Sequence, residues 1–347
     1  MAANQDLTLV RGGRLRRVRW GVLGTANIGV KKVIPGMQRG ASTEVVAIAS
    51  RDLARASRVA AALDIPRSHG SYEALLEDPD VDAVYIPLPN HLHVEYATKA
   101  ARAGKHVLCE KPIGLSAADA QALIDVRDET GVKMQEAFMV WTHPQWITAR
   151  DLCRSGRLGD VRAYQGAFSY FNDDPKNIRN VEAWGGGGLY DIGCYLIVTS
   201  RFVFGQEPRR VLALIDRDPA TGVDVLTSLL LDYPAGQATG TCGTRLVPCQ
   251  RVQVFGTRGR LEVEIPFNAP PDRPCRLFVD DGRDVFGGGI ETIEIPTCDQ
   301  YTIQGDLFSR AVLGDTDVPY PLEMTLANMR VIDAAFRSAR TGQWETP

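Results

Sequence analysis

The chain has 347 residues, of which 44% are hydrophobic and 23% are charged, and its formal net charge is −3. These values are typical of a globular protein that is long enough to form two domains. The slightly negative charge argues against a nucleic-acid or anionic-membrane partner, although a small anionic cofactor needs only a few local basic groups. The sequence has no apolar run that approaches the length of a membrane span.

The cysteines and the N-terminal residues bear on where the protein works. The seven cysteines are scattered, odd in number and without C-x-x-C spacing, which favours reduced thiols in the cytoplasm over a disulfide framework. Residues 1–16 are polar and then basic, and no separate apolar segment follows them before the first expected strand. We therefore expect a flexible N-terminal tail over residues 1–16 rather than a secretory signal.

The first apolar segment, residues 18–23, leads into a turn of small residues. Gly24, Ala26 and Gly29 occupy the glycine positions of the dinucleotide-binding pattern G-x-G-x-x-G, with alanine at the second position. A tight turn followed by a helix N-terminus with free N–H groups is a binding site for a pyrophosphate. The degenerate pattern also fits an ordinary strand–helix turn. The cofactor contacts predicted from this turn are Gly24, Thr25, Ala26, Asn27 and Ile28.

Strands and helices alternate as far as residue 140. Apolar runs predict strands at 43–50, 82–87, 106–110 and 133–137, and helical spacing of apolar residues predicts helices at 53–63, 92–103 and 116–129. Such alternation indicates βαβ units and a mostly parallel sheet, which binds ligands at the carboxyl ends of its strands. We predict an α/β Rossmann domain over residues 17–140.

The end of the second predicted strand bears on the choice of dinucleotide. An acidic residue there would accept hydrogen bonds from a ribose 2′-hydroxyl, but the sequence has Ser50 and Arg51. A hydroxyl and a guanidinium can hold a 2′-phosphate, so we expect NADP, with NAD as the alternative. We interpret Asp52 as the N-cap of the following helix. A solvated surface arginine is the competing interpretation of Arg51.

Two segments follow the third and fourth predicted strands. His91 and His93 form an isolated H-x-H pair without clustered cysteines or carboxylates, so we predict loop and capping roles and no metal site. The fourth strand ends in Glu110 and Lys111, followed by Pro112. A lysine at this strand end can donate to a substrate oxygen, and desolvation can shift its pKa. Proline favours a fixed turn there, compatible with a cis peptide bond. A surface lysine is the simpler interpretation of this segment alone.

Taken together, the glycine turn, Ser50-Arg51, the P-N-H-L-H segment and E-K-P resemble the Gfo/Idh/MocA oxidoreductases over nearly the whole chain from residue 17. That family includes glucose–fructose oxidoreductase, inositol dehydrogenases, dimeric dihydrodiol dehydrogenase and NADP-dependent D-xylose dehydrogenase. Ala26 departs from the family pattern, but alanine is still small. On this resemblance we extend the expected cofactor contacts to Leu88, His93, Glu110, Lys111 and Arg179.

The second half fits the same resemblance. A run of glycines at 185–188 precedes a predicted helix at 189–204, in which Asp191 and Tyr195 are four residues apart and share a face. The alternative is a purely structural role, in which an amphipathic helix has one carboxylate stabilised by the helix dipole and one half-buried tyrosine. In the family, a D-x-G-x-H or D-x-G-x-Y segment faces the nicotinamide. The tyrosine version resembles the dihydrodiol and xylose dehydrogenases and glucose–fructose oxidoreductase, and disfavours an inositol substrate.

The remaining segments predict a mainly antiparallel, open sheet with two closing helices at 301–313 and 322–341. We therefore expect an α+β domain over residues 141–347 that binds substrate and mediates oligomerisation. An open sheet needs its free face covered. In the resembling family this face forms a dimer, so a homodimer or homotetramer is implied.

The resemblance implies an NADP(H)-dependent oxidoreductase acting on a CH–OH group of a sugar or polyol, with oxidation of an aldose C1 hydroxyl to a lactone favoured. A keto-sugar reductase, a trans-dihydrodiol dehydrogenase, a non-catalytic NADP-binding regulator and an NAD-dependent glycosidase are alternatives. Lys111 and Tyr195 would handle the proton, with Asp191 orienting them and the lysine charge lowering the pKa of Tyr195. Arg179 and His143 are further candidates for the site.

Overall fold

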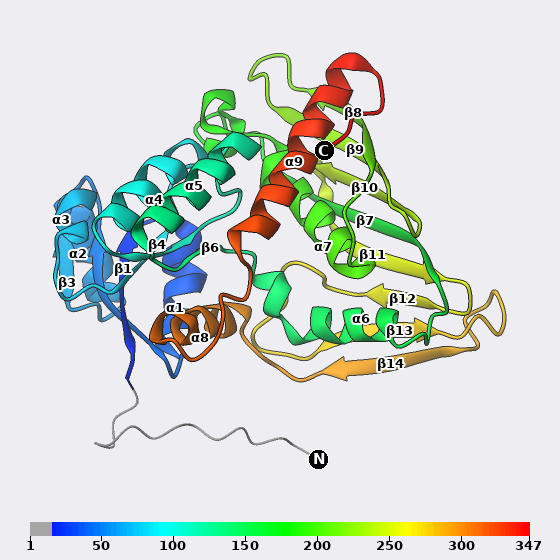
Figure 1. The fold of residues 1–347 in the computed structure, drawn as a ribbon, viewed down its shortest axis with the longest axis horizontal. Helices are drawn as coiled ribbons and strands as arrows, with labels where there is room; N and C mark the ends of the chain where they lie inside the picture. Colours follow the sequence, from blue (N-terminus) through cyan, green and yellow to red (C-terminus); the bar gives the residue numbers. More distant parts are fainter. Residues whose placement is uncertain (1–15) are drawn as a thin grey trace.

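The alternating strands and helices of the first half form a six-stranded parallel sheet in the computed structural model, which describes residues 16–347 (Figure 1). Its strand order is β3-β2-β1-β4-β5-β6, with bounds β1 (Val18–Leu23), β2 (Thr43–Ala49), β3 (Arg67–His69), β4 (Ala83–Ile86), β5 (His106–Cys109) and β6 (Met134–Glu136). The order reverses between β1 and β4, and ligands of such sheets bind at this switch point. Apart from Arg16, the expected tail lies outside the described residues.

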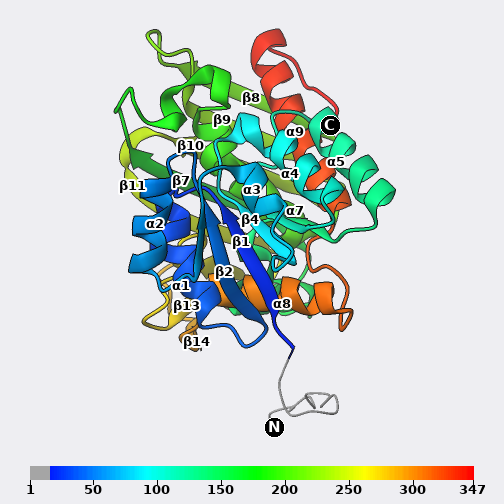
Figure 2. The ribbon, with the colours of Figure 1, turned by 90° about the vertical axis from the view of Figure 1, so that its left-hand side faces the viewer.

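Helices cover both faces of this sheet (Figure 2). The helices α1 (Ile34–Gln38) and α2 (Leu53–Ala62) lie on one face, and α4 (His93–Arg102) and α5 (Ala117–Thr130) lie on the other. A short helix, α3 (Tyr72–Leu76), and the strand β3 were not predicted, because each is too short to show a clear periodicity.

The second sheet has eight strands in the order β14-β13-β12-β11-β7-β10-β9-β8. Its neighbouring strands are antiparallel except β7 and β10, which are parallel. The bounds are β7 (Val161–Phe171), β8 (Arg210–Arg217), β9 (Asp224–Asp232), β10 (Gln237–Gly243), β11 (Arg245–Gly256), β12 (Arg260–Val263), β13 (Cys275–Asp280) and β14 (Ile290–Ile295). The predicted fold class is therefore confirmed.

Only one face of the second sheet is buried in the described part of the chain. The helices α6 (Pro144–Arg154), α7 (Cys194–Phe204) and α9 (Leu322–Thr341) lie along that face (Figure 1). Val252 and Val254 are buried on it, whereas Leu214 (76% exposed) and Phe171 (61% exposed) belong to the open face. The alternation of buried and exposed residues along the strands is the pattern of a sheet with one packed face.

The helix α8 (Gln300–Leu313) connects the two halves of the molecule. It packs against α1 and the parallel sheet, although it follows the second sheet in the chain (Figure 1). The indole Nε1 of Trp20 donates a hydrogen bond of 3.0 Å to the Ser309 hydroxyl, and the Trp20 ring also contacts Phe308. Within residues 16–347, no helix combines the length and the apolar character needed to cross a bilayer.

Candidate active site

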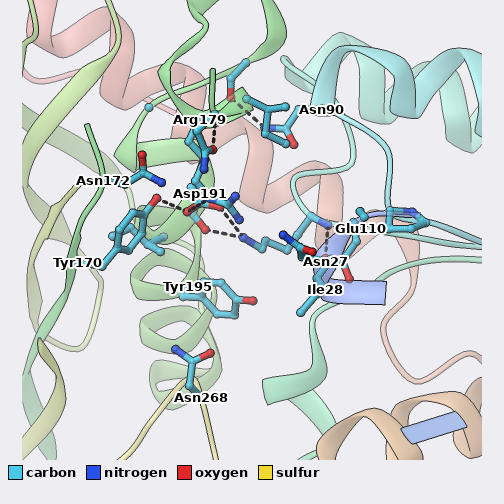
Figure 3. A pocket seen from close by; sticks show the side chains of 18 of the residues that line it. Asn27, Ile28, Asn90, Glu110, Tyr170, Asn172, Arg179, Asp191, Tyr195 and Asn268 are labelled. Atoms are coloured by element: carbon cyan, nitrogen blue, oxygen red, sulfur yellow. Dashed lines mark hydrogen bonds and ion pairs between the residues drawn. The ribbon is translucent and has the colours of Figure 1, made fainter. Parts of the chain in front are cut away.

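A cavity of about 1070 Å³ lies where the carboxyl ends of the parallel strands meet the second sheet. One side consists of loops that follow β1, β4 and β5, and the other of β7 and the first turns before α7 (Figure 3). Of the predicted cofactor contacts, those that line this cavity are Ala26, Asn27, Ile28, Leu88, Glu110, Lys111 and Arg179.

The glycine turn has the shape expected of a dinucleotide cradle. Gly24 has a φ of +112°, and a Cβ atom there would lie 3.1 Å from the Leu88 side chain. The chain then exposes Asn27 and Ile28 to the cavity and enters a π-helical turn at Gly29–Val33. Because π-helical turns are rare and often mark functional sites, this local geometry supports cofactor binding at the turn.

The three polar residues after β2 have different roles. Asp52 accepts a hydrogen bond of 3.1 Å from the Arg55 amide, which confirms it as the N-cap of α2. The Ser50 hydroxyl accepts one from the Asp52 amide, while Arg51 is exposed and does not line the cavity. Arg55 does line it, and its guanidinium reaches the Thr25 carbonyl at 3.3 Å. Arg55 was not predicted from the sequence, although it lies four positions after Arg51.

His93 is buried and does not line the cavity. Its exposed fraction is 0%, and its ring nitrogens lie 2.7 Å from the carbonyl oxygens of Leu88 and Pro112. Burial lowers its pKa to about 4, so a neutral ring donates to only one of them. The expected direct cofactor contact is therefore wrong, because His93 instead ties together the loops that follow β4 and β5.

Lys111 is held by the other half of the molecule. Its ammonium donates to the Asp191 carbonyl at 2.5 Å and lies 3.3 Å from the Asp191 Oδ1 (Figure 3). Burial by itself lowers the pKa of Lys111, but the Asp191 carboxylate, together with Cys194 and Glu110, leaves that pKa raised. The Lys111–Pro112 peptide bond is cis. Lys111 is thus a charged donor in a cavity wall rather than a solvated surface residue.

Three side chains donate hydrogen bonds to Asp191. Besides Lys111, the Tyr170 hydroxyl and the Arg179 Nε donate to its Oδ2 at 2.5 and 2.8 Å. Burial would raise the pKa of this carboxyl, but the Arg179 and Lys111 charges and these hydrogen bonds hold it well below the usual range. Tyr170 was not predicted, because its position depends on the register of β7 and no sequence motif marks it.

The Tyr195 ring lies beneath the lysine. The Lys111 ammonium is 5.0 Å from the ring centroid, and the Tyr195 hydroxyl donates to the Met139 sulfur at 3.5 Å. Burial raises the pKa of Tyr195 well above its ordinary value, and Cys194 and Glu110 raise it further. The expected lowering of this pKa by Lys111 is therefore wrong, because the ammonium contacts the ring face and not the phenol oxygen.

The glycine run positions the turn that carries Asp191. That turn is a π-helical segment, Leu189–Gly193, whose first amide donates to the buried Asp224 carboxylate at 2.6 Å. A Cβ atom on Gly187 would lie 1.9 Å from that carboxylate, and the φ of Gly187 is +112°. Only glycine fits both conditions. Across the cavity, the Asn90 side-chain amide donates to the Gly185 carbonyl at 2.8 Å.

His143 does not belong to the site. It is 1% exposed, its Nδ1 accepts from the Gln145 amide as the N-cap of α6, and its Nε2 lies 3.4 Å from the Cys298 sulfur. It does not line the cavity, which corrects the expectation that it would.

Comparison with known proteins agrees with this architecture. Residues 18–138 match the family described as "Oxidoreductase family, NAD-binding Rossmann fold", and residues 146–262 match the "GFO/IDH/MocA C-terminal domain". The chain belongs to the Gfo/Idh/MocA oxidoreductase family. The resemblance expected from the sequence is therefore confirmed, and the protein is a sugar-related, NAD(P)-dependent oxidoreductase.

Several members of the family are similar along nearly their whole length. An uncharacterized oxidoreductase of Rhizobium meliloti is 49% identical over 95% of this chain and 99% of its own. An NADP(+)-dependent D-xylose 1-dehydrogenase of Haloferax volcanii is 42% identical over 93% and 98%. The structure of a 3-ketoreductase from Actinomadura kijaniata with NADP and TDP-benzene superposes with a TM-score of 0.86, at 31% identity over 93% and 98%.

Proposed function

We propose that this Gfo/Idh/MocA protein is an NADP(H)-dependent oxidoreductase that interconverts a CH–OH group and a carbonyl on a sugar or polyol, with oxidation of an aldose C1 hydroxyl to a lactone as the favoured reaction. The observation that carries the proposal is the pair of Lys111 and Asp191 over the Tyr195 ring. This group faces the same cavity as the glycine turn. The similar D-xylose dehydrogenase supports the choice of an aldose.

The residues around the cavity fit NADP. The turn at Gly24 and the π-helical start of the next helix can hold a pyrophosphate, and Arg55 adds a guanidinium beside Ser50 and Arg51 for a 2′-phosphate. When bound, the nicotinamide supplies the hydride chemistry. The protein has to position the substrate carbon and to move the proton of the hydroxyl group.

Lys111, Tyr195 and Asp191 are the proposed catalytic residues. Lys111 donates a hydrogen bond to the substrate oxygen, and Asp191 holds the lysine charged and in place. Tyr195 exchanges the proton: during reduction it donates its own proton to the carbonyl oxygen, and during oxidation it first releases that proton to solvent and then accepts the proton of the substrate hydroxyl. Because the pKa of Tyr195 is raised, its resting state carries the proton, which suits it as the proton donor in the reductive direction.

The rest of the cavity suits a ligand with many hydroxyl groups. The side of the cavity opposite the glycine turn is lined by Asn172, Lys176 and Asn268. The Asn268 amide lies below Tyr195 (Figure 3). Amide and ammonium groups give the donors and acceptors that sugar hydroxyls need, and apolar side chains such as Phe168 and Trp184 line other parts of the cavity.

The test is a substrate panel with the purified full-length protein. Aldoses, polyols and a trans-dihydrodiol are supplied with NADP or NAD, and keto-sugars with NADPH, while reduced nicotinamide is followed by absorbance. Net NADPH formation with an aldose supports the proposal. Turnover only with keto-sugars or dihydrodiols supports the corresponding alternative. Release of a free sugar without net NADPH would indicate a glycosidase, and NADP binding without turnover of any compound would indicate a regulator.

The domain organisation and assembly belong to the same proposal. We assign residues 17–140 to NADP binding and 141–347 to substrate binding and oligomerisation, and we propose a homodimer or homotetramer formed through the open face of the second sheet. Exposed apolar side chains such as Leu214 and Phe171 support an interface there. A cytoplasmic location fits the seven cysteines, all of which are free.

A further inference from the structure

A buried carboxyl group lies behind the turn that carries Lys111. Glu136 ends β6, its exposed fraction is 0%, and its Oε1 accepts a hydrogen bond of 2.8 Å from the Ile113 amide. Ile113 is only two residues after Lys111, so the glutamate is bonded directly to the backbone of the turn. Glu136 does not line the substrate cavity and has no part in the mechanism above.

The second carboxyl oxygen of Glu136 belongs to a group of buried polar atoms. Within residues 16–347, neither Oε2 nor the hydroxyls of Tyr320 and Thr325 have a partner at hydrogen-bond distance, although Thr325 is near enough to lower the pKa of Glu136 and Glu136 raises that of Tyr320. Glu136, Tyr320 and Thr325 are all fully buried. Apolar residues of similar size would give a more stable fold here, because an unpaired buried polar group lowers the free energy of unfolding. The cluster therefore indicates a role other than packing.

The charges around Glu136 connect it to Lys111. The cationic groups that act on it are Lys111, in the turn after β5, and Arg201 on α7, and both favour its ionised form. The other titratable groups that face it are Cys109 on β5, Cys194 on α7 and Tyr320 before α9, all of which are held neutral by burial. Burial raises the pKa of Glu136 to about 7, so the carboxyl changes its charge near neutral pH.

We propose that Glu136 is a positioning residue for Lys111: its carboxyl fixes the Lys111–Ile113 turn, and its negative charge supports the lysine ammonium from inside the protein. The inference rests on the proposed catalytic role of Lys111. Asp191 holds the ammonium from the second half of the molecule, and Glu136 holds the backbone of the same residue from the first.

The variant Glu136→Gln separates the charge from the hydrogen bond. A glutamine oxygen can still accept from the Ile113 amide, but the side chain does not ionise. Below about pH 6 the wild-type glutamate is itself protonated, so kcat of the variant should match the wild type within about twofold. Above pH 8 the wild type has a charge that the variant lacks, and kcat of the variant should be about tenfold lower, with KM changed less. A constant ratio of kcat at all pH values would overturn the proposal.

The matched control is Asp333→Asn. The Asp333 carboxylate also accepts from a backbone amide, that of Ala117, at 2.8 Å, and burial raises its pKa too. It does not line the cavity. This variant should change stability without changing the pH dependence of kcat.

A second test does not depend on activity. In thermal unfolding of the wild type, Glu136→Gln, Lys111→Met and the double variant, the effects of the two substitutions should be non-additive at pH 8 and additive at pH 5. Since the folded pKa of Glu136 is above the unfolded value of about 4.3, its contribution to stability should decrease between these values as the pH rises. Additivity at both pH values would refute the coupling even if no substrate is found, whereas coupling without sugar turnover would leave Glu136 coupled to Lys111 and overturn only the proposed function.

Discussion

Replacing Asp191 with asparagine tests the centre of the site, because three donors converge on its carboxylate. The side chains of Lys111 and Asp191 are only 11% and 14% exposed, so we treat their ion pair as buried. The Arg179 side chain is 40% exposed, so solvent screens its charge. Removing one partner of a buried pair costs about 3–5 kcal/mol. An asparagine oxygen still accepts one hydrogen bond, so we expect the lower end, about 3 kcal/mol.

The activity should fall with the stability, but for a separate reason. Lys111 would keep its bond to the carbonyl of residue 191 and lose the nearest negative charge, so its pKa would fall because less charge opposes the effect of burial. We expect kcat to fall by about 10²-fold, the lower end for the loss of a proton-transfer group. Because the pKa of Asp191 is held low, the stability difference should be complete above about pH 4 and should shrink as the pH falls below that value.

The assay combines denaturant unfolding with steady-state kinetics of both proteins. The control is Glu207→Gln, which removes the carboxylate that pairs with the buried Arg201 at 2.6 Å, away from the cavity. The control should lose stability and keep kcat. A loss of less than about 1 kcal/mol in Asp191→Asn, with kcat within about threefold of the wild type, would show that the converging donors are unimportant.

Four further variants test the remaining assignments. Arg51→Ala and Arg55→Ala should each weaken NADP binding, by up to about 10–100-fold for the residue that contacts the 2′-phosphate, and should hardly change NAD binding; equal losses for both cofactors would contradict the NADP assignment. Tyr195→Phe should lower kcat by about 10²–10⁴-fold at unchanged cofactor affinity, and a variant that keeps most of kcat would leave Lys111 as the proton donor. Light scattering should show a species larger than 38.0 kDa that becomes monomeric in Leu214→Asp, and a wild-type monomer at micromolar concentration would exclude the proposed interface.

Most of the fold could be predicted from the sequence because its long elements have strong periodicity. The strands of both sheets and helices such as α7 and α9 contain enough apolar residues at regular spacing to be recognised. The elements that were missed are short or mixed: β3 has three residues, and α6 follows directly on a 3₁₀ turn. The pattern of a whole domain extends over many residues, whereas each of these local elements has too few regularly spaced apolar residues to be recognised.

The site was predictable only where a motif marks it. Lys111, Asp191 and Tyr195 lie in short patterns, and all three line one cavity. Tyr170 and Glu136 have no such pattern, because their roles depend on contacts with residues 21 and 23 positions away in the chain. The direction of the Tyr195 pKa shift was also out of reach, since it depends on whether the lysine lies over the ring or beside the oxygen.

The contact between Lys111 and Asp191 also acts as an interlock between the two halves of the chain. Lys111 follows a strand of the parallel sheet, Asp191 precedes a helix of the other half, and 80 positions separate them in the sequence. A chain in which only the first half is folded can form the dinucleotide cradle, but its lysine lacks the carboxylate that keeps it charged. Under the proposed mechanism, the catalytic arrangement therefore forms together with the substrate cavity, so a partly folded chain that already holds a cofactor is inactive.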